Sequence, residues 1–543
     1  MRQARSPPCK PHYDGGPMNQ AYGAQGLQPV DLSDIRFENT FVRELPADAV
    51  LINTPRRVHN ACYTRVEPTT VAEPRLLAWA DDLGRMLGIE RPAATGPGAE
   101  VLGGNRLLPG MQPYAARYGG HQFGHWAGQL GDGRAITLAE VIAEDGMRQE
   151  LQLKGAGRTP YSRSADGRAV LRSSVREFMC SEAMHYLGVP TTRALSLVGT
   201  GETVVRDMFY DGNPRPEPGA VVCRVAPSFV RFGNFQILSA HDETDALRRL
   251  ADYVMREHFP GIGTHADWYR EICRRTGELM ADWMRLGFVH GVMNTDNMSI
   301  LGLAIDYGPY GWLEGYDPEW TPNTTDAQGR RYCYGNQPHV AQWNLARLAE
   351  ALLPLIPDKA QLEEGLALYA ETFASAWQRA LAQKLGLAAL DQPGDDELVK
   401  ELFETLAETE TDFTICFRNL AADAADSAAL LEALRPAFYD GNSSNERLAA
   451  WLRRYVSRVR QEGVDAPARR ARMHAANPKY VFRNYLAQQA IDALERGDAS
   501  VLERLMAVLR HPCDEQPAHQ DLAARRPEWA RHKAGCSALS CSS

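Results

Sequence analysis

The sequence predicts an α+β protein with a strand-rich N-terminal lobe, a helical C-terminal lobe and a helical C-terminal extension. Two observations support this prediction. Short alternating β-like runs and Gly-rich turns fill residues 100–240, whereas apolar residues at helical spacing dominate from about residue 240 nearly to residue 510. A chain of 543 residues is long enough for more than one hydrophobic core.

Changes in this pattern set the predicted domain boundaries. These are 1–34 for a flexible N-terminal arm, 35–240 for the N-terminal lobe, 241–385 for the C-terminal lobe and 386–543 for the helical extension with its Cys-containing tail. The strongest element predictions are strands over 134–143, 148–157 and 219–233, and helices over 169–189, 244–259 and 266–288.

The composition excludes several classes of protein. A formal net charge of −9 argues against a general nucleic-acid binder. No apolar run approaches the roughly 18 residues that a membrane span needs. The first residues contain no apolar stretch of the kind found in secretory signals. We therefore expect a cytoplasmic monomer without nucleic-acid or membrane partners.

Cysteines and histidines do not form a metal motif in the sequence. The ten cysteines show no C-x-x-C pair, and we expect most to be reduced and inert, with Cys536 and Cys541 near the C-terminus as the exception. His121 and His125 have metal-like spacing in "YGGHQFGHWAG". The surrounding glycines argue against a helix that would align them, so we interpret them as packing or turn residues.

Four elements follow one another in the order used by protein kinases. The stretch "GQLGDGRA" is a Gly-rich turn, Lys154 ends a predicted strand, and Glu177 lies on the following helix. The fourth element is "HGVMNTDNMSILGLAIDYGP", residues 290–309. Each element alone also fits a simple turn, a surface lysine or a helix cap. Together they favour a nucleotide site.

The fourth element departs from the kinase pattern at one position. The residue expected to accept a proton is Val292, which cannot do so. Asn297 has the spacing of the metal-binding asparagine, and Asp306 begins an Asp-Tyr-Gly in place of Asp-Phe-Gly. Amide and carboxylate oxygens are suited to Mg²⁺. Asp296 lies directly beside Asn297 and offers a displaced base.

Long motifs of the sequence resemble the selenoprotein O family, called YdiU in bacteria. They are "YGGHQFGHWAGQLGDGRA", "LQLKGAGRTPYSRSADGRAVLRSSVREF", "HGVMNTDNMSILGLAIDYGP" and "NPKYVFRNYLAQQAI", and the resemblance runs from about residue 35 to the C-terminus. It implies a two-lobed protein-kinase-like fold that binds ATP in an inverted orientation. It also implies transfer of AMP, rather than phosphate, to hydroxyl groups of proteins.

The resemblance also implies roles for single residues. Asp296 matches the proton acceptor, Asn297 and Asp306 match ligands of Mg²⁺ or Mn²⁺, and Glu177 matches the partner of the lysine. The nucleotide-binding positions implied by the family pattern are Gly131, Gly133, Arg134, Lys154, Asp166, Gly167, Glu177, Arg224, Arg231 and Asp306.

Several alternatives remain open from the sequence. A conventional kinase with a relocated base and a catalytically inactive nucleotide-binding scaffold both fit the motifs, and transfer of UMP from UTP belongs to the same class as AMP transfer. The family often has an activation-loop cysteine that pairs with the C-terminal one. Here Pro322 takes that place, which leaves a Cys333–Cys541 bridge as a hypothesis.

Overall fold

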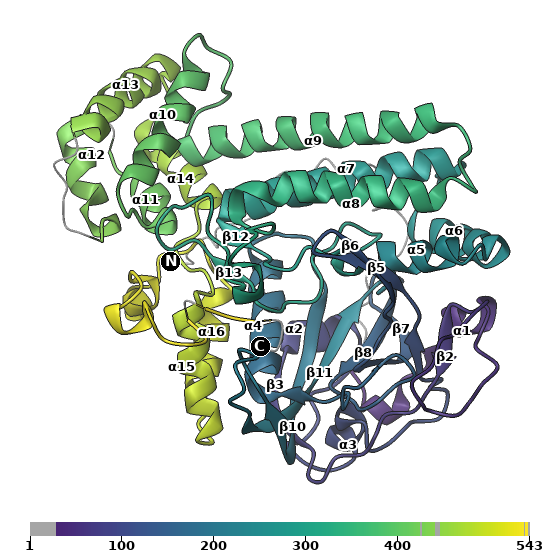
Figure 1. Cartoon of the computed structure of the whole chain (residues 1–543). Helices are drawn as coiled ribbons and strands as arrows, with labels where there is room; N and C mark the ends of the chain where they lie inside the picture. The colour runs from purple at the N-terminus through teal and green to yellow at the C-terminus, as the bar shows by residue number, and fades with distance from the viewer. Residues whose placement is uncertain (1–28, 424–425, 440–445, 537, 541–543) are drawn as a thin grey trace.

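Figure 1 shows the computed structural model of the chain, which describes residues 29–423, 426–439, 446–536 and 538–540. Residues 1–28 of the predicted N-terminal arm lie outside the described part. The fold is mixed α/β, with most of its strands before residue 227 and most of its helices after it. No helix among the described residues has the length and apolar character needed to cross a membrane.

A nine-stranded antiparallel sheet organises the first part of the chain. The strand order is β2-β4-β7-β8-β11-β10-β3, with β1 beside β7 and β9 beside β11. The strands are β1 Phe37–Glu38, β2 Tyr63–Arg65, β3 Arg75–Trp79, β4 Tyr114–Ala116, β7 Ala135–Ile142, β8 Arg148–Lys154, β9 Ala169–Val170, β10 Arg193–Arg206 and β11 Arg215–Ala226.

Four helices belong to this part: α1 Thr40–Glu44, α2 Asp81–Met86, α3 Pro97–Gly103 and α4 Leu171–Tyr186. Helix α4 packs against β10 and β11, and its residues Val175 and Phe178 are fully buried. The predicted helix over 169–189 is confirmed. It ends where expected, since Gly188 has a φ of 79°, a conformation that most other residues avoid.

The strand predicted over 219–233 was wrong in its second half. Strand β11 ends at Ala226, directly before Pro227, which has no N–H to donate to a neighbouring strand. Helix α5 Phe232–Ala240 follows. The Asn234 side chain accepts a hydrogen bond from the Arg231 N–H at 2.8 Å and so stabilises the start of this helix.

Long helices dominate the next part: α6 Thr244–His258, α7 His265–Leu286, α8 Gln337–Leu352 and α9 Lys359–Leu385. Helices α7, α8 and α9 lie side by side across the top of Figure 1. Helix α7 begins where the Thr264 hydroxyl accepts a hydrogen bond from the Asp267 N–H, and it ends at Gly287. Its buried face includes Trp268, Ile272 and Trp283.

The C-terminal part is also helical. Its helices are α10 Asp395–Glu408, α11 Phe413–Asn419, α12 Ser427–Leu434, α13 Glu446–Glu462, α14 Ala466–Ala476, α15 Asn484–Glu495 and α16 Ser500–Leu509. Helices α10 to α14 share a hydrophobic core that includes Phe417 of α11 and Trp451 of α13. These five helices lie at the upper left of Figure 1. Helices α15 and α16 instead pack against α4.

Two small hairpin-like pairs lie away from the large sheet. Strands β5 Gly119–Gln122 and β6 His125–Gln129 form an antiparallel hairpin. Strands β12 Phe288–Val289 and β13 Gly311–Trp312 pair across the segment that contains residues 290–309. The β12–β13 pair therefore brings the two ends of the predicted catalytic stretch together.

Candidate active site

Lys154 and Glu177 form an ion pair at the end of the central strands. Lys154 is the last residue of β8, and it lies opposite Ala135 of β7 and Val222 of β11. Its Nζ is 2.5 Å from Oε2 of Glu177 on α4. Because α4 packs on this sheet, the helix carries the glutamate to the lysine, as the sequence predicted.

Asp306 joins this pair from the other side. Its Oδ1 is 3.3 Å from Lys154 Nζ and 2.5 Å from Arg224 Nη1, while its Oδ2 is 2.5 Å from Arg231 Nη1. Arg224 also bonds Glu177, at 2.9 Å. Burial alone would raise the pKa of Asp306, but the charges of Arg231, Arg224 and Lys154 outweigh it and hold that pKa well below its usual range.

The backbone at Asp306 is unusual. Its φ is 56°, in the left-handed region that few non-glycine residues occupy. The conformation turns the carboxylate toward Arg224 of β11 and Arg231, the residue before α5. A strained residue held by its surroundings is typical of functional sites.

The cluster of five charged residues has more positive than negative charge. It consists of Lys154, Glu177, Arg224, Arg231 and Asp306 and is called the Asp306 cluster below. Three cations are in contact with two carboxylates, so the cations of the cluster outnumber its carboxylates by one, while Asp132 and Asp296 act on Arg231 from farther away. The Lys154 and Asp306 side chains keep exposed fractions of 13% and 17%, so the cluster is open to a ligand.

The Gly-rich turn lies beside this cluster. A small pocket is lined by Arg134 together with Lys154 and Glu177. The Gly133 carbonyl accepts a hydrogen bond from the Ser162 hydroxyl. At Gly131, φ is 97° and a Cβ would lie 2.4 Å from the Tyr161 ring, so only glycine fits there.

Asp166 and Gly167 lie on the loop between β8 and β9. Asp166 pairs with Arg206 of β10 at 2.7 Å. Gly167 approaches the backbone of Gly157 so closely that a Cβ would lie 2.2 Å from the Gly157 carbonyl carbon. Among the described contacts, neither residue touches the Asp306 cluster. The structure thus unites five of the predicted positions and leaves these two on a neighbouring loop.

Asp296 and Asn297 lie in a 3₁₀ turn, Thr295–Asn297. The Asn297 amide donates to the Val292 carbonyl at 3.0 Å, which leaves the amide oxygen to act as an acceptor or ligand. Arg231 donates to the Asp296 carbonyl at 2.9 Å and so ties this turn to the Asp306 cluster. Burial raises the pKa of the Asp296 carboxyl to about 6.

His290 supports the strand-like segment that leads to Asp306. Its ring stacks on Trp283 of α7, with centroids 5.3 Å apart, and its Nε2 lies 2.8 Å from the Ile305 carbonyl oxygen. The role of this histidine is therefore to position the backbone immediately before Asp306. Val292 is 8% exposed and packs as an ordinary apolar residue.

The β5–β6 hairpin contacts the Thr295–Asn297 turn, a contact that the sequence did not predict. Gln122 Nε2 donates to Asp296 Oδ2 at 3.2 Å, and the His121 N–H donates to Thr295 Oγ1 at 2.7 Å. His121 and His125 are the motif residues that drew attention in the sequence. The signal that was missed is the run of glycines around them, which permits a close approach of two backbones.

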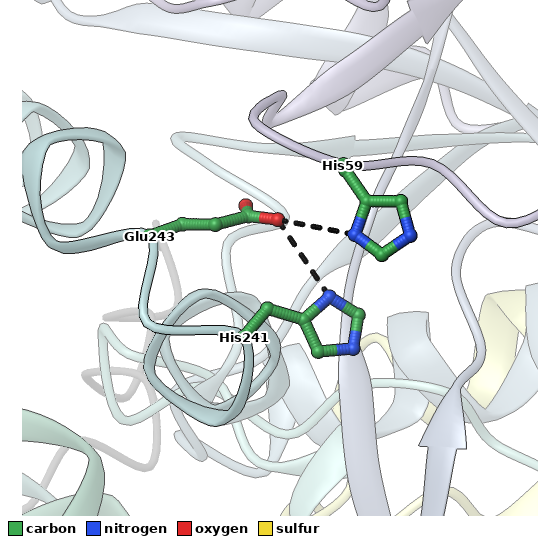
Figure 2. Close-up of side chains that lie close together, drawn as sticks. All are labelled: His59, His241 and Glu243. Carbon is green, nitrogen blue, oxygen red and sulfur yellow. Dashed lines mark ion pairs between the residues drawn. The ribbon is translucent and has the colours of Figure 1, made fainter.

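A second charged cluster lies apart from these residues. Figure 2 shows Nδ1 of His59 and Nδ1 of His241 turned toward the same oxygen of Glu243, each at 3.6 Å. Among the described residues this trio has the spacing of metal ligands. The fully buried Arg117, however, donates to both Glu243 oxygens, at 2.6 and 3.1 Å, and to His241 Nδ1 at 2.9 Å.

Arg117 thus takes the place that a metal ion would need. Its guanidinium neutralises the Glu243 carboxylate and occupies the Nδ1 lone pair of His241. A divalent cation would have to displace this buried positive charge. Arg117, His59, His241 and Glu243 together form the Glu243 cluster. We place no metal ion at it.

The thiol hypothesis is tested only in part. Cys333 is buried and carries a free thiol. Cys536 is also free, but it is buried, so the expectation that it is an exception to the inert cysteines was wrong. Cys541 lies outside the described residues. Because the Cys333 thiol is free, the hypothetical Cys333–Cys541 bridge is not formed in this structure.

Comparisons with known proteins place the chain in a family. Residues 52–510 match the family model "Protein adenylyltransferase SelO". A protein nucleotidyltransferase YdiU of Nitrosospira multiformis is 65% identical over 94% of this chain and 97% of its own length. A relative of the same name from Azoarcus sp. is 59% identical over 93% of this chain and 99% of its own length.

A third relative, from Xanthomonas axonopodis pv. citri, is 56% identical over 94% of this chain and its whole length. It bears the same name. These comparisons define a nucleotide-transferring protein, and the structure gives it a mixed α/β architecture. The chain belongs to the SelO protein adenylyltransferase family, and the resemblance found in the sequence is confirmed.

Proposed function

We propose that this protein transfers AMP from ATP to hydroxyl groups of Ser, Thr or Tyr residues in other proteins and releases pyrophosphate. The single observation that carries the proposal is the Asp306 cluster, whose three partly accessible cationic side chains suit a polyphosphate ligand. Membership of an adenylyltransferase family supports the same reaction.

A kinase-like division into two lobes accompanies this proposal. The strand-rich lobe would comprise the sheet with α4, and the helical lobe would begin at α6. Lys154 and Glu177 come from the first lobe, whereas Asp296 and Asp306 come from the second. The nucleotide then lies between them, where a strand lysine and a helix glutamate orient its phosphates.

Three groups of residues divide the work of nucleotide binding in this proposal. Lys154, Arg134 and the backbone of the Gly-rich turn contact the phosphates. Arg224 and Arg231 hold Asp306 in place and add positive charge beside it. Asp166 and Gly167 contact the nucleotide from the neighbouring loop, which is the part of the proposal that rests most on family resemblance.

The donor groups near the phosphates suit a hard divalent cation. Asn297 has its amide oxygen free of the Val292 contact. Asp306 offers a carboxylate whose oxygens are held by Lys154, Arg224 and Arg231, so a bound ion would have to take the place of one of these contacts. An all-oxygen set of this kind fits Mg²⁺ or Mn²⁺ rather than a metal that prefers sulfur or nitrogen. Such an ion, when bound, offsets the negative charge of the phosphates.

Asp296 is the proposed proton acceptor. The hydroxyl oxygen of the acceptor protein forms a bond to the α-phosphorus, the bond from that phosphorus to the β-phosphate oxygen breaks, and pyrophosphate leaves. The hydroxyl proton passes to the Asp296 carboxylate. Lys154 and Arg134 stabilise the charge that builds up on the leaving pyrophosphate. Positioning and charge stabilisation contribute most of the rate enhancement in such reactions.

Intact-mass analysis of an acceptor protein tests this function. After incubation with ATP and Mg²⁺ or Mn²⁺, the acceptor gains the mass of an adenylyl group. A gain of one phosphoryl group supports a conventional kinase, and no gain with either metal supports an inactive scaffold. A parallel reaction with UTP shows whether uridylyl transfer also occurs.

A further inference from the structure

Three successive residues of the β5–β6 hairpin donate hydrogen bonds to residues 294–296. The His121 N–H donates to Thr295 Oγ1 at 2.7 Å, and Gln122 Nε2 donates to Asp296 Oδ2 at 3.2 Å. The Phe123 N–H donates to Asn294 Oδ1 at 3.2 Å. Three consecutive hairpin residues thus bind Thr295, Asp296 and Asn294, so the two segments hold one another in place.

Phe123, at the tip of the hairpin, makes further contacts. Phe123 has a φ of 50°, which is rare for an aromatic residue. Its N–H also donates to the Tyr332 hydroxyl at 2.9 Å, and that hydroxyl donates to Asn294 Oδ1 at 2.6 Å. Such a conformation persists only where its surroundings enforce it, so the contacts with Asn294 and Tyr332 fix the backbone of Phe123.

The two oxygens of Asp296 have different environments. Oδ1 is buried and has no hydrogen-bond partner in the described part of the chain. It lies against Gly120, where a Cβ would be 2.6 Å away. Oδ2 is the oxygen that Gln122 holds. The residue is 7% exposed, and because Oδ1 is covered, that exposure belongs to its other atoms.

We infer that Gln122 is a positioning residue for AMP transfer: it fixes the Asp296 carboxylate so that Oδ2 faces the acceptor hydroxyl, while Gly120 leaves the space that Oδ1 occupies. This inference rests on the proposed function of Asp296 as the proton acceptor. Gln122 acts through Asp296 and need not touch the nucleotide. A carboxylate free to rotate would present its basic lone pair in the wrong direction for part of the time.

Two variants of Gln122 separate hydrogen bonding from shape. Gln122→Ala removes the side chain, and Gln122→Glu keeps its shape but replaces the donor by a second carboxylate. The exposed His125 on the same hairpin gives the matched control, His125→Ala. Gly120→Ala tests the other oxygen, because its Cβ must push Oδ1 out of place.

The assay uses ATP labelled on the α-phosphorus, Mn²⁺ and dephosphorylated casein as a generic hydroxyl acceptor, with initial rates measured over a range of ATP concentrations. We expect Gln122→Ala, Gln122→Glu and Gly120→Ala each to lower the apparent kcat by about tenfold or more while KM for ATP stays unchanged. His125→Ala behaves like the unaltered protein.

Three results would overturn the inference. They are a Gln122→Glu variant as active as the unaltered protein, a rise in KM for ATP with kcat unchanged, or equal losses in all variants including His125→Ala. If the unaltered protein itself fails to label casein or any other acceptor, the proposed function fails instead. Thermal melting of each variant confirms that the rates refer to folded protein.

Discussion

The carboxylates of Glu243 and Asp306 are both held by buried arginines, but the balance of charge around them differs. Glu243 is matched by Arg117 alone, and the two histidines beside it need carry no charge. Asp306 pairs with three cationic side chains, and among the described residues Glu177 is the one other carboxylate in ion-pair contact with them, while Asp132 and Asp296 act on Arg231 from farther away. The Glu243 cluster is therefore complete without a ligand, and the Asp306 cluster is not.

This difference shows that residue types and spacing do not by themselves define a ligand site. His59, His241 and Glu243 have the spacing of metal ligands, yet a fixed guanidinium already fills the position of the cation. The Asp306 cluster contains no histidine, but its surplus positive charge and partial exposure suit phosphate oxygens. The predictions below test whether charge balance separates the two clusters.

The largest effect is expected for Asp306→Asn. Loss of this carboxylate removes the proposed metal ligand and frees Arg224 and Arg231 to move. We expect AMP transfer to fall by about 10³-fold. The measurement is the labelling rate of an acceptor protein by α-labelled ATP, with circular dichroism to verify the fold. Activity within a few-fold of normal would contradict the central position given to Asp306.

Lys154→Met should have the next largest effect. The side chain keeps its length but loses the charge that faces Glu177 and the phosphates, so we expect a loss of about 10²-fold in the transfer rate. Lys154→Arg is a second variant that keeps the charge. It should also be impaired, because a planar guanidinium does not reproduce the point charge of an ammonium. Full activity of the methionine variant would show that the pair has only a structural role.

Arg117→Met should affect stability rather than chemistry. It leaves the buried Glu243 carboxylate without its partner, and breaking a buried pair in this way costs about 3 kcal/mol of the free energy of unfolding. Denaturant unfolding measures this loss. The transfer rate per folded molecule should stay unchanged, and a selective loss of ATP binding would contradict the separation of the two clusters.

His59→Ala should have the smallest effect. Its imidazole is largely exposed, with 56% of the side chain accessible, and it makes a long contact with Glu243 and stacks on the His241 ring at 4.9 Å. We expect a change in the free energy of unfolding of no more than about 0.5 kcal/mol and no change in the Mg²⁺ or Mn²⁺ concentration that supports half-maximal transfer. A shifted metal requirement would instead identify the Glu243 cluster as a metal site.

The sequence predicted those parts of the site whose residues belong to regular elements. Lys154 at a strand end and Glu177 on the next helix were recognisable because period-2 and period-3.6 patterns place them. Family resemblance, not pattern, supplied Arg224 and Arg231, and the structure places both on Asp306. The roles of all these residues in nucleotide binding stay predictions.

Contacts between distant segments could not be predicted from the sequence. The Glu243 cluster combines residues from positions 59, 117 and 241–243, and no local pattern in the sequence predicts that they meet. The hydrogen bond from Gln122 to Asp296 joins residues 174 positions apart. Helix α5 was missed because the apolar run before it reads as a strand, and only Pro227 marks where that strand must end.

The fate of the two ends of ATP is the most direct test of the proposed reaction. Parallel reactions with ATP labelled on the α- or on the γ-phosphorus, analysed on a denaturing gel, show which phosphorus stays on the acceptor. AMP transfer predicts that the α-label remains with the acceptor protein and the γ-label leaves as pyrophosphate, and that Asp306→Asn abolishes the α-label. A γ-label retained on the acceptor would contradict AMP transfer and identify a phosphoryl-transferring kinase.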